Sequence, residues 1–303
     1  MTYAAVVVSY NRITLLEECL AALHRQTHPL DEIIVVDNGS TDGSADFITA
    51  NYPEIILHRT GVNLGGAGGF AWGVDIAIAR GHRAAWLMDD DARPEDDAFA
   101  PLVDTFERMD PAPSFLASVV TVERGVPNLS NSPSVSTNIR SQFAAQAAGG
   151  IAADAATFVG VLINLELAAQ THLPLDDYFI WLDDAEYTAR LSAIAPAMSV
   201  PTSMVNHPDS SAKRDMGGRL FYFTRNRIWQ IRAAAIPRRT KIAQTSGVLA
   251  AGFGQLPHAA NKRLWLSSIA RGVWKGWTRT PRRRQPGALV ATLAPAERER
   301  LLN

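Results

Sequence analysis

The sequence has only one cysteine, Cys19, among its 303 residues. An internal disulfide is therefore excluded, and so low a cysteine content fits a reducing compartment. Long hydrophobic runs are missing too, so no segment is long enough to cross a bilayer as a helix. The first residues lead straight into a strand-like stretch, from which we expect no signal peptide and a cytoplasmic location.

Acidic residues are missing from one stretch near the end of the sequence. Between His258 and Arg284 there are eight Lys or Arg residues and no Asp or Glu, although the formal net charge of the chain is −1. Trp265, Trp274 and Trp277 lie in the same stretch. Indole rings and cations together favour a surface of anionic lipid. A nucleic acid would need the same charges, but no nucleic-acid-binding motif accompanies them. We therefore expect peripheral association with the inner face of the cell membrane and no nucleic-acid partner.

The first part of the chain alternates short apolar runs with helical patterns, which predicts an α/β fold. Hydrophobic residues make up 47% of the chain, enough for a packed core. We expect buried strands at residues 4–8, 32–36, 55–58 and 84–88. The short connections predict a largely parallel sheet with right-handed crossovers. Farther on we expect a helix at 97–109, a strand at 115–122, an irregular segment over the site at 125–150, a strand at 157–163, an extended segment at 197–205 and a helix at 220–235.

Three consecutive carboxylates, Asp89, Asp90 and Asp91, follow the fourth apolar run. In open α/β sheets, ligands bind at the carboxyl ends of the strands. Three adjacent acids repel one another, and a hard divalent cation that prefers oxygen ligands relieves this repulsion. In the alternative interpretation, Asp91 caps a helix that opens at Pro94 and the other two acids are solvated. The presence of three acids favours a metal–diphosphate site.

Two further connections between strands and helices carry candidate binding residues. Asp37 ends the second strand, where a carboxylate can accept a hydrogen bond from a ribose or a base; capping of the next helix by Asp37 or Ser40 is an equal alternative. The glycine run from Gly65 to Gly69 follows the third strand, which is the wrong place for a dinucleotide-binding turn. These glycines let backbone N–H groups approach a phosphate or sugar, or let a helix lie close to the sheet.

A second acidic cluster, Asp183, Asp184 and Glu186, follows Phe179 and Trp181. Trp181 offers a flat face on which a sugar ring could stack. An acid held beside aromatic rings would have a raised pKa and could act as a general base. In the structural alternative, Asp183 or Asp184 caps a helix and Glu186 lies in its first turn.

Basic residues in the second half of the chain are candidates for binding phosphate. His207 is followed by Pro208 and then by the pair Lys213 and Arg214, which could neutralise a diphosphate, although a lone histidine is more often structural. Arg225 lies among aromatic residues in a predicted helix. That pattern suits a phosphate-binding face and a solvated helix face equally.

Together these residues resemble glycosyltransferase family 2, the inverting nucleotide-sugar transferases of the GT-A fold. The resemblance is carried by segments 7–12, 35–42 and 89–91, and it covers roughly residues 4–230. Three more segments, at 63–70, 179–186 and 221–227, are similar to bacterial galactofuranosyltransferases. Within that group, the similarity is greatest to the type that begins the galactan chain.

The resemblance implies a role for each matching residue. Asp89 and Asp91 would bind Mn²⁺ or Mg²⁺, with His207 as the third protein ligand. The catalytic acids would be Asp184 as the base, with Asp183 and Glu186 beside it. The donor would be held by Ser9, Tyr10, Asn11, Arg12, Asp37, Asn38, Asn63, Gly65, Gly66, Asp90 and Trp181. Contacts to phosphate or acceptor would come from Lys213, Arg214 and Arg225.

The resemblance also implies a reaction: transfer of galactofuranose from UDP-galactofuranose to a glycan acceptor, of the polyprenyl-diphosphate-linked kind, in cell-envelope polysaccharide synthesis. It implies a GT-A domain at 1–235, with a nucleotide-sugar half at about 1–122 and an acceptor half at about 150–235. A helical region at 236–303 would contact the membrane surface or another subunit. Another donor, such as dTDP-rhamnose or a UDP-hexopyranose, is the alternative. A non-catalytic nucleotide-sugar-binding protein is disfavoured because every expected acid is retained.

Overall fold

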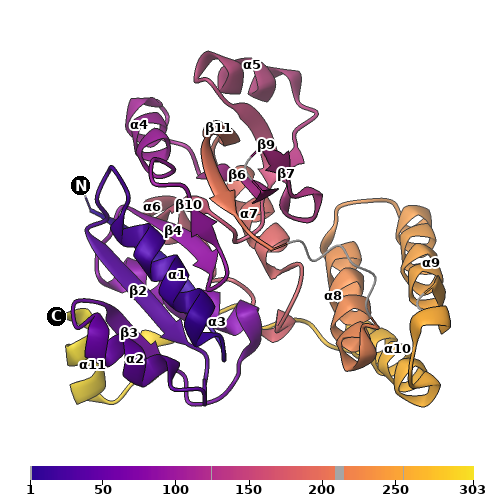
Figure 1. Cartoon of the computed structure of the whole chain (residues 1–303). Coiled ribbons are helices and arrows are strands. Elements are labelled where there is room, and N and C mark those ends of the chain that lie inside the picture. The colour runs from indigo at the N-terminus through magenta and orange to yellow at the C-terminus, as the bar shows by residue number, and fades with distance from the viewer. Residues whose placement is uncertain (1, 124, 209–214, 255) are drawn as a thin grey trace.

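Four parallel strands form one half of the central sheet of the computed structural model, which describes residues 2–123, 125–208, 215–254 and 256–303 (Figure 1). Their order is β3-β2-β1-β4. The strands are β1 (Tyr3–Ser9), β2 (Glu32–Asp37), β3 (Ile56–Arg59) and β4 (Ala84–Asp89). The helices that connect them are α1 (Ile13–His24), α2 (Ser44–Asn51) and α3 (Gly65–Ala79). Because these strands run the same way, the polar residues that follow β1, β2 and β4 meet at one edge of the sheet.

The other half of the sheet is mixed. β10 runs antiparallel to both β4 and β6, whereas β11 runs parallel to β6. The strands of this half are β5 (Arg93–Pro94), β6 (Phe115–Glu123), β7 (Val126–Pro127), β8 (Ser134–Val135), β9 (Ile151–Ala155), β10 (Val161–Asn164) and β11 (Ala197–Asn206). The short helices here are α4 (Ala100–Arg108), η1 (Leu129–Asn131), α5 (Ile139–Ala147), α6 (Leu165–Ala168), η2 (Asp176–Tyr178) and α7 (Asp183–Ser192). The predicted α/β class with a mostly parallel central sheet is confirmed.

Hydrophobic side chains fill both faces of the sheet. Alternate residues of a strand point to opposite faces, so Val7 contributes to one hydrophobic cluster and Val6 to the other. The first cluster holds Trp86, which is fully buried and stacks on Phe99 with ring centroids 5.1 Å apart. The second lies under α3 and includes Phe70. Helices therefore cover both faces of the sheet, and the polar residues lie at the carboxyl ends of the parallel strands.

Three predicted segments differ from the structure. The segment at 125–150, predicted to be irregular, contains α5, whose first turn is capped by the Asn138 side chain accepting hydrogen bonds from the N–H groups of Arg140 and Ser141. The helix predicted at 97–109 begins only at Ala100, and the strand predicted at 157–163 is the shorter β10. Alanine favours a helix in α5 in spite of its polar surroundings.

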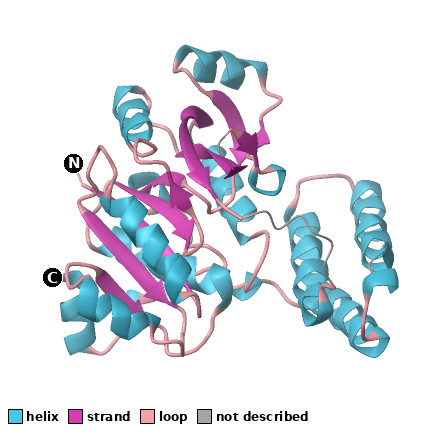
Figure 2. Cartoon of the chain, in the orientation of Figure 1, coloured by secondary structure: helices cyan, strands magenta, loops and turns pink. Residues whose placement is uncertain are grey.

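A bundle of helices lies to one side of the sheet (Figure 2). It consists of α8 (Leu220–Ala233), α9 (Arg238–Gly254) and α10 (Lys262–Thr278), with the short turns η3 (Gly217–Arg219) and η4 (Leu256–His258). α8 and α10 lie very close together, because a Cβ on Gly272 would be 2.8 Å from the Cβ of Thr224. Trp265, predicted to lie at a lipid surface, is buried, and its indole N–H donates to the Gly252 carbonyl at 3.0 Å. Within the described ranges, none of the helices has the length and hydropathy to cross a membrane.

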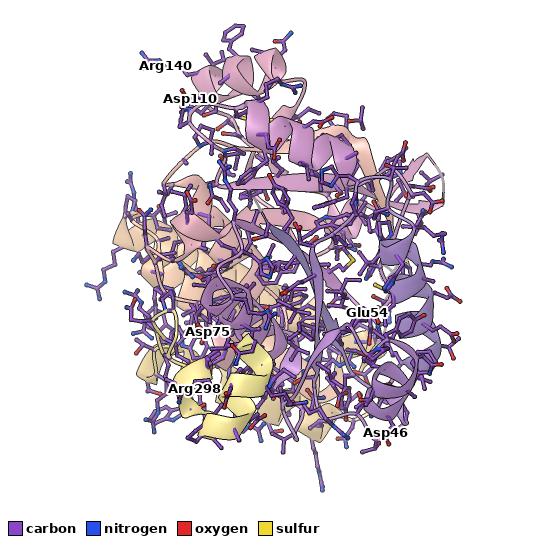
Figure 3. The ribbon with its side chains drawn as sticks, turned by 90° about the vertical axis from the view of Figure 1, so that its left-hand side faces the viewer. Asp46, Glu54, Asp75, Asp110, Arg140 and Arg298 are labelled. Carbon is purple, nitrogen blue, oxygen red and sulfur yellow. The ribbon has the colours of Figure 1, made fainter. Side chains whose placement is uncertain are left out.

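The chain after α10 returns to the sheet. Asp75 of α3 is fully buried, and its carboxylate accepts hydrogen bonds from the N–H groups of Gly287, Leu289 and Val290. The last elements are η5 (Val290–Thr292) and α11 (Pro295–Leu302), and α11 contacts α3 and β3. Figure 3 shows the labelled Asp75 next to this C-terminal ribbon. Residues 236–303, expected to form one helical region, are thus divided between the bundle and the sheet.

Candidate active site

Asp90 is held between the ends of β1 and β4. It is only 3% exposed, and its Oδ2 accepts hydrogen bonds from the Ser9 hydroxyl and the Tyr10 N–H, both at 3.0 Å. The Arg12 guanidinium contacts both Asp90 and Asp91. Burial raises the pKa of Asp90, against the effect of these donors. Four residues that the resemblance assigned to donor binding, Ser9, Tyr10, Arg12 and Asp90, therefore lie together at the sheet edge.

Asp89, Asp91 and His207 form a cluster that can hold a metal ion. One ligand atom from each residue lies within 4.8 Å of the other two. The Nε2 of His207 and the buried Oδ1 of Asp91 are 3.0 Å apart. Two carboxylates and one imidazole are suitable ligands for Mn²⁺, and the carboxylates for Mg²⁺ as well. The donor set therefore fits a shared divalent cation.

Strand pairing brings His207 to this cluster. β5, only two residues after Asp91, pairs with the end of β11, so that Arg93 lies opposite Asn206. The His207 N–H then donates to the Thr121 carbonyl at 2.8 Å. The alternative in which Asp91 caps a helix opening at Pro94 is wrong, because Pro94 belongs to β5 and the next helix begins at Ala100.

The imidazole of His207 is oriented by its second nitrogen. Its Nδ1 lies 2.9 Å from the Pro208 carbonyl, which accepts a hydrogen bond when Nδ1 carries the proton. With the proton on Nδ1, Nε2 keeps its lone pair, and such a partner on the remote nitrogen is usual for metal-binding histidines. The Nδ2 of Asn131 lies 3.3 Å from Nδ1, which accepts from it only in the other tautomer.

The charges of the cluster shift one another's pKa values. Burial, together with the neighbouring charge of Asp91, raises the pKa of Asp89 to about 7. Burial opposes the ionised form of Asp91, but the contact with His207 holds the pKa of Asp91 below its usual value. Burial likewise disfavours the imidazolium, yet the contact with Asp91 raises the pKa of His207. A bound dication would favour the deprotonated form of all three groups.

The turn after β2 is tied to the turn after β1. Asp37 is buried and accepts a hydrogen bond from the Ser40 N–H at 3.2 Å. The Oδ1 of Asn11 accepts one from the Thr41 N–H at 2.7 Å. Neither Asp37 nor Ser40 caps the next helix, as the structural alternative required, because α2 begins at Ser44.

The same turn is also tied to the beginning of α3. Asn38 donates from its Nδ2 to the Gly65 carbonyl at 2.9 Å and accepts at its Oδ1 from the Leu64 N–H at 3.0 Å. The Oδ1 of Asn63 accepts from the Gly65 N–H at 2.7 Å. Three predicted donor-binding residues, Asn38, Asn63 and Gly65, are therefore joined by hydrogen bonds.

The glycine run serves mainly to bring α3 close to its neighbours. A Cβ on Gly69 would lie 2.4 Å from the Val8 side chain, so this part of the run lets the helix approach β1. Gly65 has φ +74°, and a Cβ there would lie 2.0 Å from the Phe179 carbonyl oxygen. No heavy atom among the described residues is within 4 Å of a Cβ built on Gly66. Gly66 is thus the position of the run at which a ligand has room.

The second acidic cluster opens α7. The Oδ1 of Asp184 accepts a hydrogen bond from the Ala185 N–H at 2.7 Å, and burial raises the pKa of both Asp183 and Asp184. The charge of Asp184 makes a small contribution to the raised pKa of Asp89. Glu186 instead forms an ion pair with Arg190 at 3.1 Å within the same helix. The structure therefore places Glu186 in a structural ion pair.

Arg225 is occupied by the protein itself. It is 8% exposed and is surrounded by aromatic rings, with the Trp229 centroid 4.3 Å from its Cζ. Its Nη2 donates to the Tyr178 carbonyl at 3.0 Å, and burial lowers its pKa to about 10. These contacts favour a structural role over the predicted phosphate contact. Lys213 and Arg214, the other predicted phosphate ligands, lie outside the described residues.

Two residues near the site were not predicted from the sequence. Asn131 contacts the Nδ1 of His207, and Asn226 donates to the backbone at Trp181. Asn131 gave no signal, because it lies in a segment rich in small polar residues. Asn226 gave none either; the structure shows it as a fully buried amide in a helix whose other buried side chains are mostly apolar.

Residues 4–146, which include the first three strands, the glycine run and the triple Asp, match the model of Glycosyl transferase family 2. The chain carries a family 2 glycosyltransferase domain. The chain is similar to galactofuranosyltransferase GlfT1 of Mycolicibacterium smegmatis, with 41% identity over 92 residues. That match spans 30% of this chain and only 30% of the length of the relative.

The fold of this glycosyltransferase is similar to that of solved transferases. The S. aureus protein TarS (fragment 1–349), in complex with UDP-GlcNAc, superposes with a TM-score of 0.58 and 15% identity, covering 98% of this chain and 85% of that one. A mannosyltransferase from Pyrobaculum calidifontis, in complex with GDP-Man and Mn²⁺, gives a TM-score of 0.57 and 17% identity, covering 99% and 84%. At these identities the likeness shows the fold alone, and the predicted GT-A fold is confirmed.

Proposed function

We propose that this glycosyltransferase is an inverting, metal-dependent enzyme that transfers galactofuranose from UDP-galactofuranose to a lipid-diphosphate-linked glycan. The observation that carries the proposal is the convergence of Asp89, Asp91 and His207 within 4.8 Å. A diphosphate needs a cation at such an edge, and a sugar transfer by displacement needs a base opposite the departing group.

In this proposal each group of the chain has a task. A divalent ion held by Asp89, Asp91 and His207 would neutralise the charge that grows on the departing UDP. Asp184 takes the proton of the acceptor hydroxyl as its oxygen attacks the anomeric carbon. One displacement inverts the configuration, so a second nucleophilic carboxylate is not needed. Asp37 and Asn38 lie where the turns after β1 and β2 meet, and we assign them to the uracil–ribose part of the donor.

The donor sugar is supported by the similarity to GlfT1, which is named a galactofuranosyltransferase. The second candidate is another nucleotide sugar, such as a UDP-hexopyranose or dTDP-rhamnose. The TarS structure, which shares only the fold, is in complex with UDP-GlcNAc, a UDP-hexopyranose. Both candidates use the same metal site and the same base.

A panel of nucleotide sugars with added Mn²⁺ tests the proposal. Thermal shifts and release of the nucleoside diphosphate are measured for each donor, with a lipid-diphosphate glycan as acceptor. We expect the greatest stabilisation and UDP release with UDP-galactofuranose. Preference for dTDP-rhamnose or a UDP-hexopyranose would replace UDP-galactofuranose as the proposed donor. Absence of any Mn²⁺-dependent nucleotide binding would reject the proposed enzymatic function.

We also infer that the helical bundle contacts an anionic membrane surface. Residues 216–296 contain fifteen Lys or Arg and no Asp or Glu, so the bundle and the segment that follows it form a cationic unit. Large apolar side chains are exposed on the same helices, among them Trp274 at 67% and Trp277 at 47%. Exposed indoles with many cations suit the headgroup region of a bilayer that contains anionic lipid. An acceptor carried by a lipid would then be met at that surface.

A further inference from the structure

The loop that precedes the second acidic cluster has an unusual backbone. Phe179, Trp181 and Leu182 have φ values of +63°, +66° and +72°. Side chains other than glycine, asparagine and aspartate are disfavoured in this left-handed region. Such a conformation persists only where the surrounding structure enforces it, and it is often found next to functional groups. Asp183 and Asp184 follow this loop directly.

Asn226 of α8 supplies that enforcement. Its side chain is fully buried, and its Nδ2 lies within hydrogen-bond distance of three carbonyl oxygens of the loop. It donates to the carbonyl oxygens of Tyr178, Ile180 and Trp181 at 3.0, 2.9 and 3.0 Å. One amide group thus fixes the directions of the carbonyl groups that flank Phe179 and Trp181, two of the left-handed residues.

Arg225 determines which way the Asn226 amide points. Its Nε and Nη2 donate to the Oδ1 of Asn226 at 3.0 and 2.9 Å, which leaves the Nδ2 facing the loop. The guanidinium is held in turn by the rings of Phe221, Tyr222 and Trp229, with centroids 5.0, 5.1 and 4.3 Å from its Cζ. This accounts for the aromatic and basic residues at the start of α8, which the proposed reaction does not otherwise use.

The loop is also held from the opposite side. The Phe179 carbonyl accepts a hydrogen bond from the Ala67 N–H at 3.2 Å, and Gly65 is too close to that carbonyl to carry a Cβ. The loop therefore lies between α8 and the beginning of α3. Its position depends on contacts from both.

We propose that Asn226 is a positioning residue for the transfer reaction: by holding the carbonyls of Tyr178, Ile180 and Trp181 it sets the position of Asp184. This inference rests on the proposed function of Asp184 as the base. Asn226 itself is fully buried, so we expect no contact between it and the donor or acceptor. Its loss should therefore affect the rate of transfer and leave nucleotide binding in place.

The test compares Asn226→Ala with Ile228→Val in the full-length protein. Ile228 lies in the same helix but faces α10, where a Cβ on Gly276 would be 2.9 Å from its Cβ. We expect kcat to fall at least tenfold in Asn226→Ala, with the Kd of UDP in Mn²⁺ within twofold of the wild type. Ile228→Val should lower the Tm and leave kcat within twofold. A kcat within twofold in folded Asn226→Ala, or equal losses of kcat and UDP affinity in the two variants, would overturn the proposal.

Arg225→Lys provides a second variant should Asn226→Ala fail to fold. Lysine keeps the cation but lacks the planar fork that orients the amide, so kcat should again fall with UDP affinity unchanged; an unchanged kcat would contradict the role. Hydrogen exchange distinguishes failure of the role proposed for Asn226 from failure of the proposed function, because it needs no substrate. The amides of residues 178–184 should exchange at least tenfold faster in either variant than in the wild type, even if no donor is turned over. Unchanged exchange would overturn the role of Asn226.

Discussion

The Nε2 of His207 and the Oδ1 of Asp91 lie 3.0 Å apart, although the two residues come from different halves of the chain. Asp91 follows a parallel strand of the first half, whereas His207 follows β11 of the mixed half. Neither half alone can provide the set of ligands that a diphosphate-bound cation requires. The proposed metal site therefore forms only when the two halves of the sheet are joined.

Replacing the proposed base should stop the chemistry and spare binding. In Asp184→Asn the side chain keeps its size but can no longer accept a proton, so kcat should fall by about 10²- to 10⁴-fold. UDP should bind in Mn²⁺ as it does to the wild type. Glu186→Gln is the matched control, because Glu186 pairs with Arg190 and should affect stability more than rate. Turnover of Asp184→Asn at the wild-type rate, measured by UDP release, would remove Asp184 as the base.

The stability gained from Mn²⁺ should increase with pH between 6 and 8. The pKa of Asp89 is raised to about 7 and that of His207 is raised as well. Both groups bind protons more tightly in the folded state, so their contribution to stability is lost as the pH rises through these pKa values. The deprotonated ligands then bind the ion more tightly.

The measurement is Tm with Mn²⁺ and with EDTA at pH 6 and pH 8. We expect Tm in EDTA to fall towards pH 8 and the increment due to Mn²⁺ to grow. An increment that is equal at the two pH values, or larger at pH 6, would show that these groups do not bind the ion.

Asp75 should be a principal anchor of the C-terminal segment. Its buried carboxylate accepts three backbone N–H groups of residues 287–290. Asp75→Ala leaves these donors without a partner, which should lower the free energy of unfolding by about 1–3 kcal/mol. Urea unfolding measures the loss, and Asp46→Ala, at a carboxylate that is 84% exposed, should change little. Equal stability of the two variants would mean that the segment is not anchored there.

Membrane contact should depend on the tryptophans and cations of the bundle. We expect the wild type to sediment with vesicles of phosphatidylglycerol and phosphatidylcholine at low salt, and less so at high salt, because salt screens surface charges. The double substitution Trp274→Ser and Trp277→Ser should reduce binding several-fold. Phe143→Ser, at a residue 66% exposed in α5, is the control and should bind as the wild type does. No sedimentation of the wild type would reject the proposed surface.

Those features of the fold that depend on local pattern were predictable from the sequence. The first four strands were predicted to within one residue at every end, because each is a short apolar run followed by a polar turn. The triple Asp was recognised for the same reason. α5 was missed, since its polar and glycine-flanked sequence has no hydrophobic period, and a side-chain cap with alanines suffices to form it.

The remaining features depend on contacts between distant segments. No local pattern shows that α9 covers Trp265, and so the sequence could not distinguish it from the exposed Trp274. Arg225 is of a residue type that often binds phosphate, but its partners are carbonyls of a loop that approaches Arg225 only in the folded chain. The metal ligands were assigned from a family resemblance, and their convergence on one place required the pairing of β5 with β11.

Calorimetry of UDP binding tests the central claim most directly. UDP is titrated into the wild type and into His207→Ala, each with Mn²⁺ and with EDTA. The account predicts that the wild type binds UDP only weakly in EDTA and that His207→Ala loses at least about tenfold in Mn²⁺-dependent affinity. Equal UDP affinity in Mn²⁺ and in EDTA, or an unchanged affinity in His207→Ala, would contradict a shared divalent cation at Asp89, Asp91 and His207.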